Sequence, residues 1–94
     1  MDGDFSYVVR EKALADIVLH AVEGMDGTAD IHCRRIQHQE ETLQVQVSCK
    51  ARYGKPLPPL AKAMQQQIQK ALAEMTGVSR IVVAVTVEDI IMDN

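Results

Sequence analysis

Five side chains of this sequence could ligate a metal ion, namely His20, His32, Cys33, His38 and Cys49. None of them forms the CxxC, HxxxH or HExxH spacing that holds two ligands in a fixed register. His32 and Cys33 are adjacent on an expected strand, so their side chains point to opposite faces of it. The sequence therefore predicts no metal site and no cofactor. We interpret both cysteines as free core thiols of a reducing compartment.

Patterns that would indicate catalysis are also missing from the sequence. Asp16 and His20 stand four residues apart on an expected helix and could act as an acid that orients a base, but such pairs are common on exposed helix faces. The chain has neither a nucleophile elbow nor the G-x-x-x-x-G-K-[ST] loop that binds phosphate. We predict no catalytic residues and no enzymatic activity.

The run Gly24-Met25-Asp26-Gly27 matches the GxxG of KH RNA-binding domains. That loop joins two helices and approaches a nucleic-acid backbone, whereas this run lies between an expected helix and an expected strand and contains an acid. We interpret it as a helix cap followed by a turn. Ten Lys and Arg against thirteen Asp and Glu give a net charge of -3, which does not favour bulk binding of phosphates.

A local group of basic residues is the remaining chemical feature. Arg34, Lys50 and Arg52, with His32, share the polar side of an expected hairpin, and Val82 and Ala84 should lie on the same open face of the sheet. One interpretation is a solvated strand face that discourages edge pairing. The other is an interaction surface, formed by Arg34, Lys50, Arg52, Val82 and Ala84, for a protein partner or, as an alternative, for nucleic acid.

Length and composition limit the architecture that carries these residues. Ninety-four residues with 47% hydrophobic content predict one folded domain over 1–94. The acidic start, with no long apolar run after it, predicts a cytoplasmic protein. The longest apolar stretch, 81–87, is about a third of the roughly 20 residues that span a bilayer, so no direct membrane insertion is expected.

Hydrophobic periodicity gives the expected elements. Leu14, Ile17, Val18, Ala21 and Val22 predict a helix over 11–23 that ends near Gly24. A second helix over 59–76 starts at Pro59 and ends at Gly77, and its apolar stripe consists of Leu60, Met64, Ile68, Ala71, Leu72 and Met75. The glutamines of this helix, Gln65, Gln66, Gln67 and Gln69, are interpreted as a solvated face.

Strands are expected at 5–9, from Ile31 to a bend at 39–42, at 43–53 and at 80–88. The strict alternation of 43–53 is the clearest strand signal, and it places Cys33 and Cys49 on the same side of the sheet. The order β-α-β-β-α-β predicts a two-layer α+β domain, in which two helices pack on one face of a three- to four-stranded antiparallel or mixed sheet.

The second half of the chain resembles a known family. Tyr53-Gly54, then Leu57-Pro58-Pro59-Leu60-Ala61, a helix that ends Glu74-Met75-Thr76-Gly77 and the alternating valines to Val87 are similar to the alkaline shock protein twenty-three (Gls-type) envelope stress response family. The first half, including Val22-Glu23-Gly24, is similar to the opening strand and helix of that family. The resemblance covers about residues 7–88. Arg10 and the Arg-, His- and Cys-bearing hairpin depart from the family pattern.

The resemblance implies a small cytoplasmic bacterial protein without catalytic activity, which acts in cell-envelope homeostasis through protein contacts. In some members the partner is membrane-anchored, so that the protein is peripheral to the membrane. The resemblance assigns no active-site residues, because the family defines none. A homo-oligomer is a second kind of partner that the expected open sheet face would suit.

Overall fold

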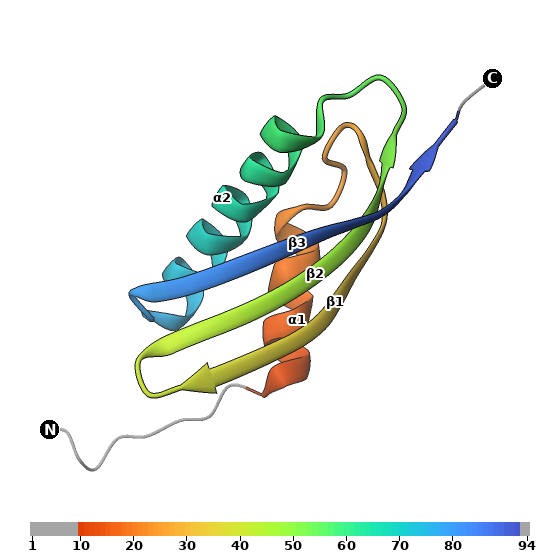
Figure 1. The fold of residues 1–94 in the computed structure, drawn as a ribbon. Coiled ribbons are helices and arrows are strands. Elements are labelled where there is room, and N and C mark those ends of the chain that lie inside the picture. Colours follow the sequence, from red (N-terminus) through yellow and green to blue (C-terminus); the bar gives the residue numbers. More distant parts are fainter. Residues whose placement is uncertain (1–9, 93–94) are drawn as a thin grey trace, which may run out of the picture.

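The computed structural model describes residues 10–92, which form two helices and three strands (Figure 1). In chain order these are α1 (Glu11–Ala21), β1 (Thr28–Gln39), β2 (Thr42–Arg52), α2 (Leu57–Thr76) and β3 (Arg80–Ile91). The expected strand at 5–9 lies outside the described residues. The architecture is α+β, as predicted from the sequence.

The sheet is mixed, with the strand order β1-β2-β3. β1 and β2 are antiparallel and meet at the expected bend, where Gln39 pairs with Thr42. β2 and β3 are parallel, because α2 carries the chain back across the sheet between them. Strand β2 is therefore central, and Val45 pairs with Ile36 on one side and with Val83 on the other.

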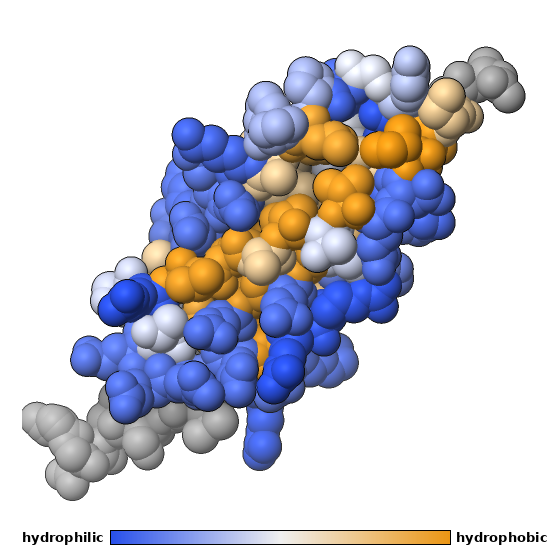
Figure 2. All heavy atoms as spheres, in the orientation of Figure 1, coloured by the Kyte–Doolittle hydropathy of each residue, from blue (hydrophilic) through white to orange (hydrophobic). Residues whose placement is uncertain are grey.

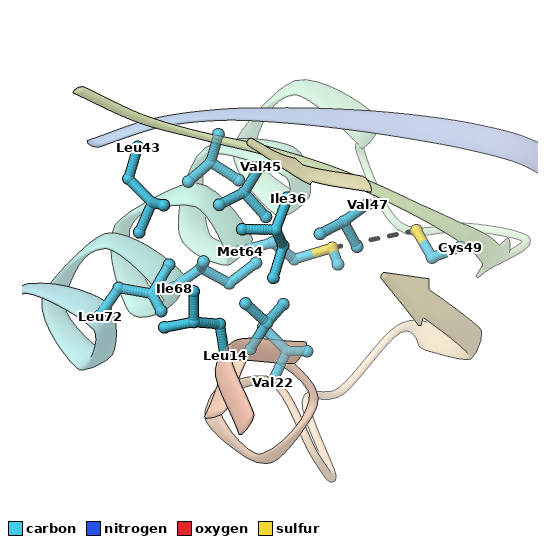
Figure 3. Close-up of a cluster of buried hydrophobic side chains, with 12 residues drawn as sticks. Leu14, Val22, Ile36, Leu43, Val45, Val47, Cys49, Met64, Ile68 and Leu72 are labelled. Carbon is cyan, nitrogen blue, oxygen red and sulfur yellow. Dashed lines mark hydrogen bonds between the residues drawn. The ribbon is translucent and has the colours of Figure 1, made fainter. Parts of the chain in front are cut away.

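Both helices lie on one side of the sheet, behind it in the view of Figure 1. The apolar stripe of α1 buries Leu14 and Val18, and the stripe of α2 buries Met64, Ile68 and Leu72. These side chains meet Val45, Val47 and Val83 from the covered face of the sheet (Figure 3). The predicted burial of Leu14, Ile68 and Val83 is confirmed.

Three details of α2 and the cysteines refine the sequence prediction. The helix begins at Leu57 and not at Pro59. Proline is accommodated in the first helical turn, because the N–H group that it lacks would have no partner there. Met75, which the sequence assigns to the apolar stripe, is 66% exposed and lies outside the core. Cys33 and Cys49 do lie on the same side of the sheet, and the Cys49 thiol lies 3.9 Å from the Met64 sulfur.

A glycine with positive φ lies just after each of the two helices. Gly77 closes α2 in the left-handed conformation, with φ 75°, and its N–H donates to the Ala73 carbonyl at 2.9 Å. α1 ends at Ala21, earlier than expected, and Gly24 with φ 74° lies in the turn that follows. The two helices thus cover one face of the sheet and leave the opposite face open.

Candidate functional site: the open sheet face

The open face carries the residues that alternate with the buried ones. Arg34 lies on β1, Lys50 and Arg52 on β2, and Val82 and Ala84 on β3. All five predicted surface residues are therefore on this face. Two register shifts bend β1, between Ala29 and His32 and between Cys33 and Arg35. Such shifts redirect side chains on an edge strand, and Arg34 is the extra residue of the second one.

Arg34 is held on this face by two side-chain contacts. Its Nε donates a hydrogen bond to the Ser48 Oγ at 2.7 Å, and its Nη2 lies 3.3 Å from Glu88 Oε1. Ser48 is only 2% exposed although it lies on the open face. Arg34 thus connects all three strands across the sheet and satisfies a hydroxyl group that has lost contact with water.

Lys50 and, at longer range, Arg52 also lie near acids. Lys50 Nζ lies 3.2 Å from Asp30 Oδ2, and Asp89 pairs with Lys50 in the β2–β3 register. Arg52 continues the same side of β2, and its charge adds to the stronger effect of Lys55 in lowering the pKa of Asp26. The predicted basic residues therefore form part of a mixed-charge surface, which would attract polyphosphates less than an uncompensated basic patch would.

The apolar part of the open face runs along β3. Val82 is 50% exposed, and Ala84 and Thr86 follow it on the same side of the strand. Figure 2 shows an apolar band that crosses this face with hydrophilic margins on both sides. A large aliphatic side chain that stays half exposed on a strand is a feature of association surfaces when polar residues surround it.

The five predicted residues do not form one compact cluster. In the parallel register, Val82 lies beside Gln44 and Ala84 beside Gln46, whereas Lys50 and Arg52 are farther along β2. Four residues of strand, from Gln46 to Lys50, correspond to about 13 Å. Arg34, which contacts Ser48, lies between the apolar part and the distal cations.

Sequence reasoning misses two members of this surface. The alternation of β2 treats Ser48 as one more polar strand residue, and it gives Glu88 no role. The contact between Arg34 and Glu88 joins the two edge strands of the described sheet. The mixed strand order, with β2 between β1 and β3, is needed to bring these two residues together.

The glycine turn 24–27, which matches GxxG, is held against the β2–α2 connection. Asp26 in this turn accepts a 2.7 Å hydrogen bond from Lys55, and the Gly27 carbonyl accepts one from the Arg52 N–H at 2.9 Å. The Lys55 ammonium is the main reason that the pKa of Asp26 is lowered. The run therefore connects α1 to β1 and fastens that turn to the β2–α2 connection.

The thiols and imidazoles form no metal-ligand cluster in the described part of the chain. No three His, Cys, Asp or Glu side chains between residues 10 and 92 gather closely enough to hold a metal ion. Burial raises the pKa of both Cys33 and Cys49, which keeps the thiols protonated. Asp16 and His20, which sequence analysis considers as an acid and a base, contact other residues: Asp16 contacts Lys12, and His20 contacts Glu23.

The described surface also has open hollows near the helices. One of about 520 Å³ lies where α1 meets β1 and is lined by residues that include His20, Met25 and Asp30. Another of about 510 Å³, between α1 and α2, is mainly apolar and includes Ile17 and Met75. The second is away from the open sheet face, whereas the first includes Asp30, which contacts Lys50. Within residues 10–92, neither helix is long and apolar enough to cross a membrane.

Comparison with known proteins gives one structural and one family relationship. The fold is similar to the metal-bound C-terminal domain of the CzcD transporter from Thermotoga maritima, with a TM-score of 0.57 and 11% sequence identity. The match covers 84% of this chain and 94% of that chain. At this identity the likeness concerns the fold alone. No curated protein matches the sequence.

The family relationship covers most of the chain. Residues 14–92, from the first buried residue of α1 to the residue that follows β3, match the model of a family described by a cell envelope-related function. This match agrees with the resemblance of the Tyr-Gly, Leu-Pro-Pro-Leu-Ala and Met-Thr-Gly segments. The chain therefore belongs to the alkaline shock protein twenty-three family, whose function is related to the cell envelope.

Proposed function

We propose that this chain is a non-catalytic interaction protein that acts in cell-envelope homeostasis through protein–protein contacts made by the open sheet face. The observation that carries the proposal is the half-exposed Val82 in the apolar part of that face, opposite the side that both helices cover. The envelope-related function of the family supports the setting. The partner we propose is a protein, membrane-anchored or in the same compartment, and the chain itself stays on the cytoplasmic side.

The chemistry of the face fits a transient protein contact. Transient interfaces combine a small apolar centre with a polar rim. Here Val82 and Ala84 provide the centre, and the paired charges of Arg34 and Glu88 lie at the rim. These charges can exchange partners with a docking protein and so favour one orientation more than they add affinity.

A substitution at Val82 tests this proposal most directly. Val82→Lys places a charge at the apolar centre and leaves the core unchanged, because the side chain points away from the helices. Met75→Lys is the matched control, since Met75 is an exposed apolar residue on the helical layer. We expect both variants to melt within a few degrees of the parent.

The assay is capture of native partners by the tagged full chain, together with sedimentation of the purified protein. We expect Val82→Lys to lose its partner by roughly tenfold or more in affinity, while Met75→Lys binds like the parent. The opposite result would assign the working face to the helices. Recovery of nucleic acid in place of protein, with binding that weakens steeply as salt rises, would favour the alternative of a basic hairpin that binds phosphates.

A further inference from the structure

The free edge of β3 carries the most strand-prone segment of the protein. β3 is an edge strand of the described sheet, and its residues Ile81–Val87 contain no charge and no proline. Five of these seven residues are β-branched aliphatic side chains. An uncharged β-prone segment on a sheet edge is a ready template for pairing with another chain.

Two glutamines of α2 occupy this edge. Gln65 Nε2 donates a hydrogen bond to the Val83 carbonyl at 3.0 Å, and Gln69 Nε2 donates one to the Ile81 carbonyl at 3.1 Å. The sequence indicates that these two residues belong to a solvated helix face. The structure corrects this interpretation, because both side chains bind the edge of β3. Carbonyls two residues apart point to the same side of a strand, so both bonds close the same side of β3.

The spacing of the glutamines matches the spacing of the carbonyls. Four residues of α-helix advance about 6 Å, and two residues of strand advance about 6.6 Å. The helical position one turn before Gln65 is Ala61, which has no side-chain donor for the next outward carbonyl, that of Val85. The helix thus closes the edge at Ile81 and Val83 only.

The edge is complementary to itself in an antiparallel register centred on Ala84. In that register Val83 of one copy faces Val85 of the other, and Ile81 faces Val87. The N–H groups of Val85 and Val87 would then donate to the carbonyls that Gln65 and Gln69, respectively, now occupy. Arg80 would lie opposite Glu88 at both ends of the paired segment, an oppositely charged cross-strand pair.

We propose that the free edge of β3 is a latent pairing site for the β3 strand of a second copy of this chain, and that Gln65 and Gln69 hold it closed. Release of the two amides opens two acceptors and lets two sheets join edge to edge. The pairing site is the outward backbone edge of β3, whereas the proposed function uses side chains of the open sheet face. Q65A/Q69A leaves the open-face side chains unchanged, so this variant tests the pairing separately from the proposed function.

The test compares two double variants of the full chain. Q65A/Q69A removes both donors and keeps good helix formers at these positions. Q66A/Q67A is the matched control, because these neighbouring glutamines are exposed and make no hydrogen bond to β3. Q65M/Q69M keeps the side-chain length without an N–H donor and serves as a second test variant if the alanine variant does not fold.

Sedimentation equilibrium and hydrogen exchange are the two readouts. We expect the donor-free variants to dimerise with a dissociation constant roughly tenfold or more below that of the parent and of Q66A/Q67A. In the dimer, the backbone amides of Val85 and Val87 should exchange more slowly. Sedimentation equal to that of the parent, or dimerisation with these two amides still exchanging at the parent's rate, would overturn the proposal.

A charge reversal tests the register. Adding R80E to Q65A/Q69A places a second carboxylate opposite Glu88, and we expect the dimer to dissociate. Adding E88Q as well removes the like-charge repulsion without placing a second cation beside Arg34, and it should restore the dimer. If R80E leaves the dimer intact, or if E88Q does not recover it, the antiparallel pairing centred on Ala84 is refuted.

Discussion

The packing of α2 onto the sheet can be tested most sharply at Ile68. This residue lies in the middle of α2, is 0% exposed and belongs to the same buried cluster as Leu14 and Val83. Neighbouring turns of the helix contribute Met64 and Leu72 to this cluster (Figure 3). Ile68 is therefore enclosed by side chains of its own helix as well as by those of the other elements. Ile68→Ala should therefore create a cavity that the surroundings close only in part.

The expected loss of stability follows from the carbons removed. Three carbons at about 0.8 kcal/mol each give a transfer contribution of about 2.4 kcal/mol. A residual cavity of about 80 Å³, at about 24 cal/mol per Å³, would add about 2 kcal/mol if nothing relaxed. Alanine is the better helix former and returns about 0.5 kcal/mol. We expect a loss of about 2 to 4 kcal/mol, against a total of about 5 to 14 kcal/mol for a chain of this length.

Urea unfolding of parent and variant, followed by far-ultraviolet circular dichroism, measures this difference as a lower midpoint at an unchanged slope. Met75→Ala is the control on the same helix, and its stability should stay within about 0.5 kcal/mol of the parent because Met75 is largely exposed. An Ile68→Ala midpoint equal to that of the parent would refute the packing of α2 against β2 and β3.

Three further predictions concern the turn, the thiols and the cap of α2. The lowered pKa of Asp26 means that its pair with Lys55 contributes stability above the unfolded pKa of about 4 and loses it as the pH falls through the folded value. Asp26→Asn should thus flatten the acid side of the melting temperature against pH, and an unchanged profile would contradict the pairing. The raised pKa values of Cys33 and Cys49 predict slow alkylation by iodoacetamide at neutral pH and fast alkylation in urea, as mass spectrometry would show. Gly77→Ala should lower the free energy of urea unfolding by about 1 to 2 kcal/mol, because φ is +75° there. The left-handed conformation is the whole cost, since no neighbouring atom would clash with the new Cβ. A neutral result would argue against the left-handed cap.

The elements that sequence reasoning locates best are those with one buried face. The alternation of β2 and the stripe of α1 reflect a core on one side only, and both elements are predicted within two residues of their observed bounds. The end of β3 is harder, because the strand continues through Glu88 and Asp89 to Ile91 after a register shift opposite Cys49. A bulge breaks the period of two on which the prediction depends.

The tertiary contacts of the surface cannot be predicted from the sequence, for a different reason. Arg34 and Glu88 are far apart in the chain and meet only because β2 pairs with both edge strands. Gln65 and Gln69 have the composition of a solvated helix face, and their role follows from a match between helical and strand spacing that requires the position of α2 along β3. Propensity identifies elements, whereas these contacts depend on how the elements are placed together.

The central position of β2 also affects the order in which the protein assembles. β1 and β2 are joined by a tight turn, so their pairing closes a short loop and costs little chain entropy. The parallel pairing of β2 with β3 must wait until the whole of α2 has been made and folded back. During synthesis, the side of β2 that later receives β3 is therefore unpaired while the hairpin already exists, and the core is completed only when β3 has left the ribosome.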